Sequence, residues 1–81
     1  MGDVPMPAIG DMETIVLIQW MVSPGDTVHR TQDLAYVETD KGIIEVESFE
    51  AGVIRELLAA PGDRVAVGAP IARIDASTDD P

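Results

Sequence analysis

Apolar and polar residues alternate along this chain in short runs that are rich in Val and Ile and are interrupted by Gly or Pro. The segments 35–39 and 43–48 alternate in this way, which is typical of strands with one buried and one solvated face. Val46 and Ser48, for example, would lie on the buried face. No apolar pattern extends far enough to predict a substantial helix, so the predicted fold class is all-β.

The sequence also contains an internal repeat, which appears at an offset of 37 residues when Val16 is laid on Val53. The aligned segments are 16–28 with 53–65, and 34–37 with 71–74. Both halves contain Pro-Gly-Asp, in which Pro presets φ for a turn, Gly accepts a positive φ, and Asp can bond the backbone two residues on. Each half therefore predicts a strand, a tight turn, a short strand and another strand.

Neither half can bury its apolar face alone, so we expect the two to pack as a small sandwich or flattened barrel with approximate two-fold symmetry. The polar tip 38–42 would correspond to positions 78 and 4, which are the chain ends. The termini should thus lie opposite this tip. The segment 76–81 is small and acidic and ends in Pro, so we expect a domain over 1–75 followed by the start of a flexible linker.

Composition narrows the possible functions. A chain of 81 residues with 46% hydrophobic residues supports one modest core. Its formal net charge of −10 argues against nucleic acid and anionic membranes as partners, and no apolar run is long enough to span a bilayer. The chain has no cysteine, and His29 is isolated, so we expect no disulfide, no thiol nucleophile, no catalytic residue and no metal site.

The N-terminal sequence has neither a basic start nor an apolar core, and it lacks the Arg-rich character of a transit peptide. We therefore expect a protein that acts where it is made. The use of arginine over lysine favours a bacterial cytoplasm, with the mitochondrial matrix as the alternative. We expect the isolated domain to be monomeric.

The one lysine of the chain, Lys41, lies on the polar tip between the two strand-like runs 34–37 and 43–46. A lysine in a polar turn can be no more than a solvated surface residue. A single amine at the centre of two matching halves, however, is typical of an attachment point.

The residues around this lysine resemble the lipoyl domain of the acyltransferase subunit of a 2-oxo acid dehydrogenase complex. The resemblance rests on the run 38–41 (Glu-Thr-Asp-Lys), on Gly25 in its Pro-Gly-Asp turn and on the segment 52–54, and it covers residues 4–75. It implies a flattened barrel of two four-stranded antiparallel sheets and lipoic acid in amide linkage to Lys41. The family usually has Ala or another small side chain after the lysine, whereas this chain has Gly42.

The resemblance also implies roles for other residues. Asp40 would be the turn partner of the lysine, and Glu38 and Gly25 would help the modifying enzyme recognise the domain. A loop beside the lysine turn would contribute to partner recognition, and its residues here are Asp11, Met12, Glu13 and Thr14. Glu45 and Glu47 are either a solvated strand face or part of a surface that partners recognise by charge. We expect Met6, Met12, Met21 and Trp20 to be structural.

The function implied is that of a non-catalytic lipoyl carrier. Its partners would be a thiamine-diphosphate 2-oxo acid decarboxylase, the acyltransferase core, a flavin dihydrolipoyl dehydrogenase and a lipoate ligase or lipoyl transferase. A biotin carrier domain is an alternative, but in that family the lysine lies between two methionines. A third possibility is an unmodified adaptor or assembly domain of the same fold. The sequence leaves open whether a particular 2-oxo acid or acetoin supplies the acyl group.

Overall fold

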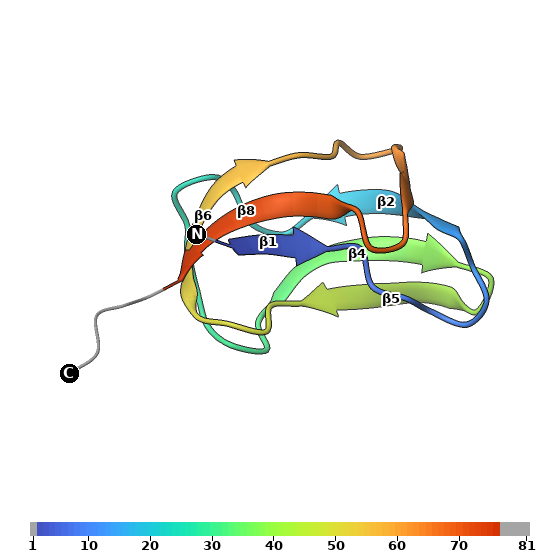
Figure 1. Ribbon diagram of the computed structural model, residues 1–81, viewed down its shortest axis with the longest axis horizontal. Helices are drawn as coiled ribbons and strands as arrows, with labels where there is room; N and C mark the ends of the chain where they lie inside the picture. The colour runs from blue at the N-terminus through green and yellow to red at the C-terminus, as the bar shows by residue number, and fades with distance from the viewer. Residues whose placement is uncertain (1, 77–81) are drawn as a thin grey trace.

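The computed structural model describes residues 2–76, and these residues form eight strands and no helix (Figure 1). The strands are β1 (Gly2–Pro5), β2 (Thr14–Trp20), β3 (Thr27–Val28), β4 (Asp33–Thr39), β5 (Gly42–Glu47), β6 (Gly52–Leu57), β7 (Arg64–Ala66) and β8 (Pro70–Ala76). The predicted all-β class is confirmed. Of the predicted linker, Ala76 ends β8, and the remainder lies outside the described residues.

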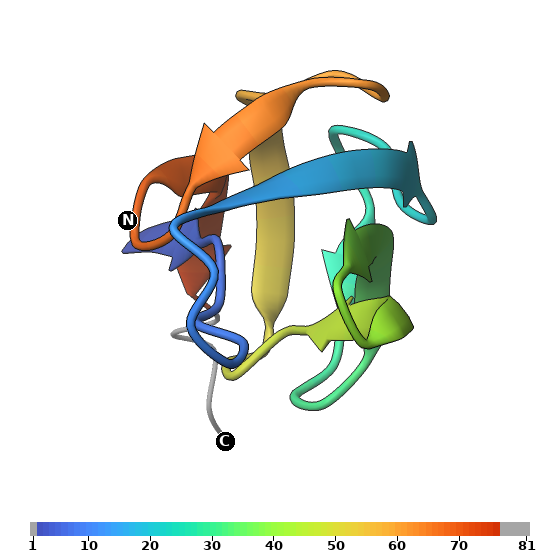
Figure 2. The ribbon, with the colours of Figure 1, turned by 90° about the vertical axis from the view of Figure 1, so that its right-hand side faces the viewer.

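The strands form two four-stranded sheets, in the orders β1-β8-β6-β3 and β5-β4-β2-β7, and every pair is antiparallel. The two orders correspond place by place: β1 matches β5, β8 matches β4, β6 matches β2 and β3 matches β7. The two strands of each matching pair are four strands apart in the chain. The two layers are seen end-on in Figure 2. The predicted flattened barrel with approximate two-fold symmetry is therefore confirmed, and β1 and β5 form equivalent edges.

The strand registers correct one detail of the predicted symmetry. Ala35 of β4 pairs with Val46 of β5, and the equivalent residue Ala72 of β8 pairs with Val4 of β1. Val4 thus corresponds to Val46 and not to the lysine tip. The reason is that β5 directly follows its partner β4 in the chain, whereas β1, the partner of β8, is the first strand of the chain. The conclusion drawn from the symmetry still holds: β1 begins and β8 ends at the end of the domain opposite the β4–β5 turn (Figure 1).

The two Pro-Gly-Asp turns join the halves. The Gly25 N–H donates to the carbonyl of Ile54, and the Gly62 N–H donates to the carbonyl of Leu17, both at 2.7 Å. The φ angles of the two glycines are 96° and 94°, as the repeat predicts for turns that need a positive φ. Each turn is therefore fixed to a central strand of the other half.

The aspartates of these turns bond differently from the prediction. The Asp26 carboxylate accepts from the Ser23 N–H at 2.8 Å, and the Asp63 carboxylate accepts from the Ala60 N–H at 2.9 Å. The expected bond to the backbone two residues further on was wrong. The side chains turn back because the next residues of the chain already pair with the neighbouring strands, β6 and β2.

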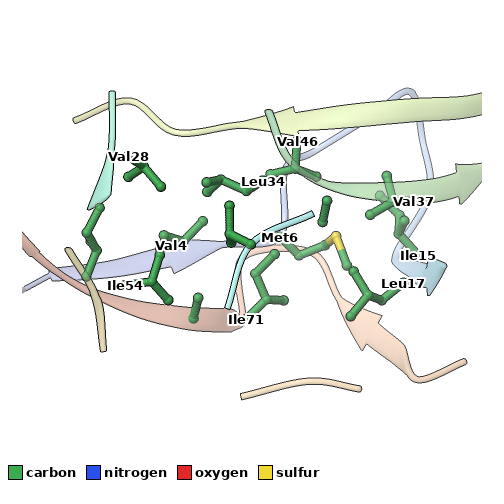
Figure 3. Packing of buried hydrophobic residues seen from close by; sticks show 14 residues of the cluster. Val4, Met6, Ile15, Leu17, Val28, Leu34, Val37, Val46, Ile54 and Ile71 are labelled. Carbon is green, nitrogen blue, oxygen red and sulfur yellow. The ribbon is translucent and has the colours of Figure 1, made fainter. Parts of the chain in front are cut away.

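The core lies between the sheets, and Figure 3 shows its side chains meeting from both layers. Its fully buried residues include Met6, Ile15, Leu17, Leu34, Ile54, Ile71 and Ile74. Val46 and Ser48 are buried as the alternation predicts. Burial of this kind contributes about 25 cal/mol per Å² of apolar surface and is the main stabilising force in a domain without disulfides.

The predictions for the methionines and the tryptophan had mixed outcomes. Met6 is 1% exposed, and Met12 packs against the core while partly exposed. Met21 was wrongly predicted to be structural: it is 42% exposed, because it follows the end of β2 in a surface turn. Trp20 packs against the core, and its Nε1–H donates to the Ala59 carbonyl at 2.8 Å, which supports the structural role.

Residues 2–76 include no helix that is both long and apolar enough to cross a membrane. The same part of the chain contains no group of three or more His, Cys, Asp or Glu residues placed to hold a metal ion.

Candidate functional site

The single lysine lies on a tight hairpin at one end of the barrel. Thr39 of β4 pairs with Gly42 of β5, so only Asp40 and Lys41 connect the two strands, and both side chains are exposed. Gly42 has a φ of 112°, whereas neither turn residue has a positive φ. A turn without positive φ angles that is followed by a left-handed glycine is a common hairpin geometry. The departure from the small side chain usual in lipoyl domains thus suits the backbone found here.

A buried threonine holds the hairpin in this shape. The Lys41 N–H donates to Thr39 Oγ1 at 3.1 Å, and Thr39 Oγ1 donates to the Gly42 carbonyl at 2.9 Å. Thr39 is only 8% exposed, so these two bonds are partly shielded from water. The backbone that carries the lysine is therefore fixed, while the lysine side chain extends into solvent.

Thr39→Val is expected to lower the free energy of unfolding by about 1–2 kcal/mol, because valine keeps the shape of threonine but loses both hydrogen bonds. Urea denaturation measures the effect as a lower midpoint at an unchanged slope. Thr14→Val is the matched control, since Thr14 accepts only a 3.4 Å bond from Arg64. Equal midpoints for the two variants would show that the threonine does not hold the hairpin.

The loop between β1 and β2 lies beside this turn (Figure 1). The Asp40 N–H donates to Met12 Sδ at 3.2 Å, and a Cβ built on Gly10 would lie 3.5 Å from Lys41 Cε. Gly10 has a φ of 58°, which lets the loop turn sharply at this point. The loop therefore reaches the lysine turn through Met12, whereas Thr14 belongs to β2 and not to the loop. The role of residues 11–14 in recognition stays a prediction.

The lysine amine forms none of the ion pairs found among residues 2–76, although acidic residues are frequent on the hairpin and on the β1–β2 loop. Those pairs are Arg55 with Asp75 and Arg73 with Glu56, both on the other sheet. Asp11, Glu13, Glu38 and Asp40 are exposed on the loop and the hairpin. An exposed amine on a fixed backbone is accessible to an enzyme that would acylate it.

The structure does not bring all predicted site residues together. Glu38 lies near the end of β4, close to the lysine in the chain, but Gly25 lies beyond the other end of β4 because β2 runs antiparallel to it. Gly25 therefore contributes to the fold through its bond to β6 and not through contact with the lysine turn. Glu45 and Glu47 are exposed further along β5.

Two residues of the site were missed by the sequence analysis. Thr39 was included in the alternating segment 35–39, but its bonds across the turn were not predicted; a hydroxyl just before a polar turn is the signal that could have suggested them. Gly10 had no recognisable signal, because its importance depends on a neighbour distant in the sequence.

An exposed lysine on a two-residue hairpin, displayed by a two-fold barrel of two four-stranded sheets, defines a carrier domain of the biotinyl/lipoyl class. Residues 2–74 match the family described as "Biotin-requiring enzyme", and the chain belongs to this biotin/lipoyl attachment family. Within the family it is a lipoyl-type domain, as the similarities to known proteins show.

The curated relatives are acyltransferase components. The chain is 47% identical over 73 residues to the dihydrolipoyllysine-residue acetyltransferase component of the pyruvate dehydrogenase complex of Corynebacterium glutamicum, covering 89% of this chain and 11% of that protein. It is 41% identical to the succinyltransferase component of the 2-oxoglutarate dehydrogenase complex of Staphylococcus saprophyticus, covering 89% of this chain and 17% of that protein. The chain thus spans less than a fifth of the length of these relatives.

A solved structure supports the same assignment. The solution structure of the lipoyl domain of the 2-oxoglutarate dehydrogenase complex from Azotobacter vinelandii superposes with a TM-score of 0.69 at 27% identity. The superposition covers 89% of this chain and 95% of that domain. The eight strands described above therefore have the fold of that lipoyl domain.

Proposed function

We propose that Lys41 carries lipoic acid in amide linkage and that the domain is a mobile carrier of acyl groups. One observation carries the proposal: the only lysine of the chain is exposed on a hairpin whose backbone is fixed by Thr39. The relatives are named as dihydrolipoyllysine-residue acetyltransferase and succinyltransferase components, which supports a lipoyl group on this chain.

The lysine turn has room for an attached lipoyl group. A Cβ built on Gly42 would have no heavy atom within 4 Å, so the turn is open on the side of β5. Amide formation removes the positive charge of the lysine, and no ion pair among the described residues has to be broken for it. A bound lipoyl group supplies a ring disulfide that accepts an acyl group while it is reduced to a thioester and a thiol. The chain has no cysteine that could enter that exchange.

The role of the chain itself is to position, and we propose that it has no catalytic residue of its own. The domain would visit a thiamine-diphosphate 2-oxo acid decarboxylase, an acyltransferase core and a flavin dihydrolipoyl dehydrogenase in turn. The ends of the described chain lie opposite the lysine, so a tether at those ends would leave the tip free (Figure 1). A tether also keeps the tip at high effective concentration near several active sites.

We further propose that the carrier domain ends near residue 75 and is followed by a flexible linker, since the sequence becomes small and acidic there. The use of arginine over lysine supports a bacterial cytoplasm, with the mitochondrial matrix as the alternative. A lipoate ligase or a lipoyl transferase would modify the domain in either place.

The experiment is the intact mass of the 81-residue chain after incubation with lipoate, ATP and a lipoate ligase. We expect a single lipoyl increment, because there is one lysine, and no increment in the Lys41→Arg variant. A parallel reaction with biotin and a biotin ligase should leave the mass unchanged, since Asp40 and Gly42 replace the methionines that flank a biotinyl-lysine. A biotin increment would identify a biotin carrier, and no increment from either active ligase would identify an unmodified adaptor.

A further inference from the structure

A groove runs between the edge strands of the two sheets, away from the lysine tip. It has a volume of about 320 Å³ and is lined on one side by Pro5 and Pro7 and on the other by Val46 and Phe49, with Glu45 and Glu47 beside them. The Phe49 side chain is 56% exposed although it is aromatic. An exposed aromatic residue in an apolar hollow is a feature of binding surfaces.

The two strands that border the groove differ in their ability to accept another strand. β5 and β1 are the terminal strands of their sheets, so each has a row of backbone groups without a neighbour in the sheet. Pro5 lacks a backbone N–H, and so does Pro7 just beyond the strand, which disfavours pairing along β1. β5 has no proline. An added strand would therefore pair with β5 and lie over the groove.

Charge determines which strand could bind there. Glu45 and Glu47 are two residues apart on β5 and both are exposed, so they lie on one face of the strand. A second copy of this chain, with a net charge of −10, would be repelled, and so would the chain's own acidic segment 76–81. The same carboxylates attract a cationic segment.

We propose that β5 and this groove bind an extended cationic segment of a partner protein, in which basic and apolar residues alternate. Paired with β5, such a segment places its basic side chains opposite Glu45 and Glu47, at the two-residue spacing of a strand. Its apolar side chains then point to the other face, into the groove beside Val46, Pro5 and Phe49. The backbone bonds supply affinity, and the alternate side chains supply specificity.

This surface is separate from the attachment site. Three residues of β5 lie between Lys41 and Glu45, and the four steps from one to the other span about 13 Å at the rise of a strand. A partner bound here would hold the domain without covering the lysine. The inference goes beyond the proposed function and does not depend on any modification of Lys41.

The test uses the Lys41→Arg chain labelled with ¹⁵N, so that no attached group can contribute. The probe is a short end-blocked peptide of alternating lysine and valine, titrated while backbone amide signals are recorded. We expect the largest shifts at residues 43–49 and 3–7. The double variant Glu45→Gln, Glu47→Gln should weaken binding about tenfold, and Phe49→Ala should do the same.

Three controls can overturn the proposal. The double variant Asp11→Asn, Glu13→Gln removes the same charge near the lysine tip; if it weakens binding as much, the attraction is non-specific. A peptide with N-methyl groups along one edge keeps its charge but cannot pair as a strand, so equally tight binding of this peptide would exclude strand addition. Binding of the glutamate-valine counterpart peptide would exclude selection by charge.

Discussion

Replacing Gly52 with alanine is expected to remove a large part of the stability of the domain. Gly52 begins β6 and pairs with Val28 on one side and Ala76 on the other. A Cβ built on it would lie 2.1 Å from the carbonyl oxygen of Asp75 and 3.0 Å from the Cα of Ala76, both backbone atoms of β8. Favourable non-bonded contacts of carbon lie near about 3.5–4.0 Å, so one of two central strands must move.

The expected loss is at least about 3 kcal/mol, which is at the upper end for overpacking because backbone and not side-chain atoms must yield. A domain of this size has a stability of about 4–12 kcal/mol in total. Urea denaturation followed by far-UV circular dichroism measures the loss. Should the variant be unfolded without denaturant, its spectrum alone will confirm the direction.

Two other glycines separate the possible causes of the loss. Gly62→Ala meets no atom within 4 Å but has a φ of 94°, so we expect about 1–2 kcal/mol from backbone strain alone. Gly2→Ala has no positive φ and meets chiefly the flexible Glu50 side chain at 3.1 Å, so its effect should be within about 0.5 kcal/mol. If Gly52→Ala resembles Gly2→Ala, the close approach of β6 and β8 does not exist in solution.

The architecture of this domain was predictable because the sequence repeats itself. The repeat at 37 residues, with one Pro-Gly-Asp turn in each half, predicts two equivalent halves, and the two sheets have equivalent strand orders. The close approach at Gly52 was not predictable. It depends on the distance between β6 and β8, which are separated in the chain, and a single glycine at the start of a strand does not indicate that distance.

The site was predictable in its centre and not in its surroundings. Lys41 and its turn partner Asp40 were identified because they are adjacent in the sequence. The bond from Asp40 to Met12 and the closeness of Gly10 to Lys41 involve segments about 30 residues apart, and such proximity leaves no local pattern. For Gly25 the structure shows a hydrogen bond to the Ile54 carbonyl of β6, while the role in recognition that the resemblance implies stays a prediction.

Exchanging the two turn residues, as Asp40→Lys with Lys41→Asp, is expected to abolish modification although a lysine remains on the tip. The exchange keeps the net charge and affects two exposed side chains, so the stability should change by less than about 0.5 kcal/mol. The Cα that carries the lysine side chain, however, is then about 3.8 Å away from its original place. The lysine stands at position 40, where the N–H donates to Met12, and no longer at position 41, where the N–H donates to Thr39. A misplacement of about 1 Å can already cost about a hundredfold in rate.

Intact mass after ligase treatment measures the result, with equal urea midpoints confirming that both proteins are folded. Asp40→Asn serves as the control, because it changes the same neighbour while leaving the lysine in place, and it should still gain a lipoyl increment. Modification of the exchanged protein at the wild-type rate would contradict the expectation, since the modifying enzyme would then require only an exposed lysine on the tip. Loss of modification in the exchanged protein alone would show that the enzyme depends on the position that the Thr39 bonds and the β1–β2 loop give to the residue at 41.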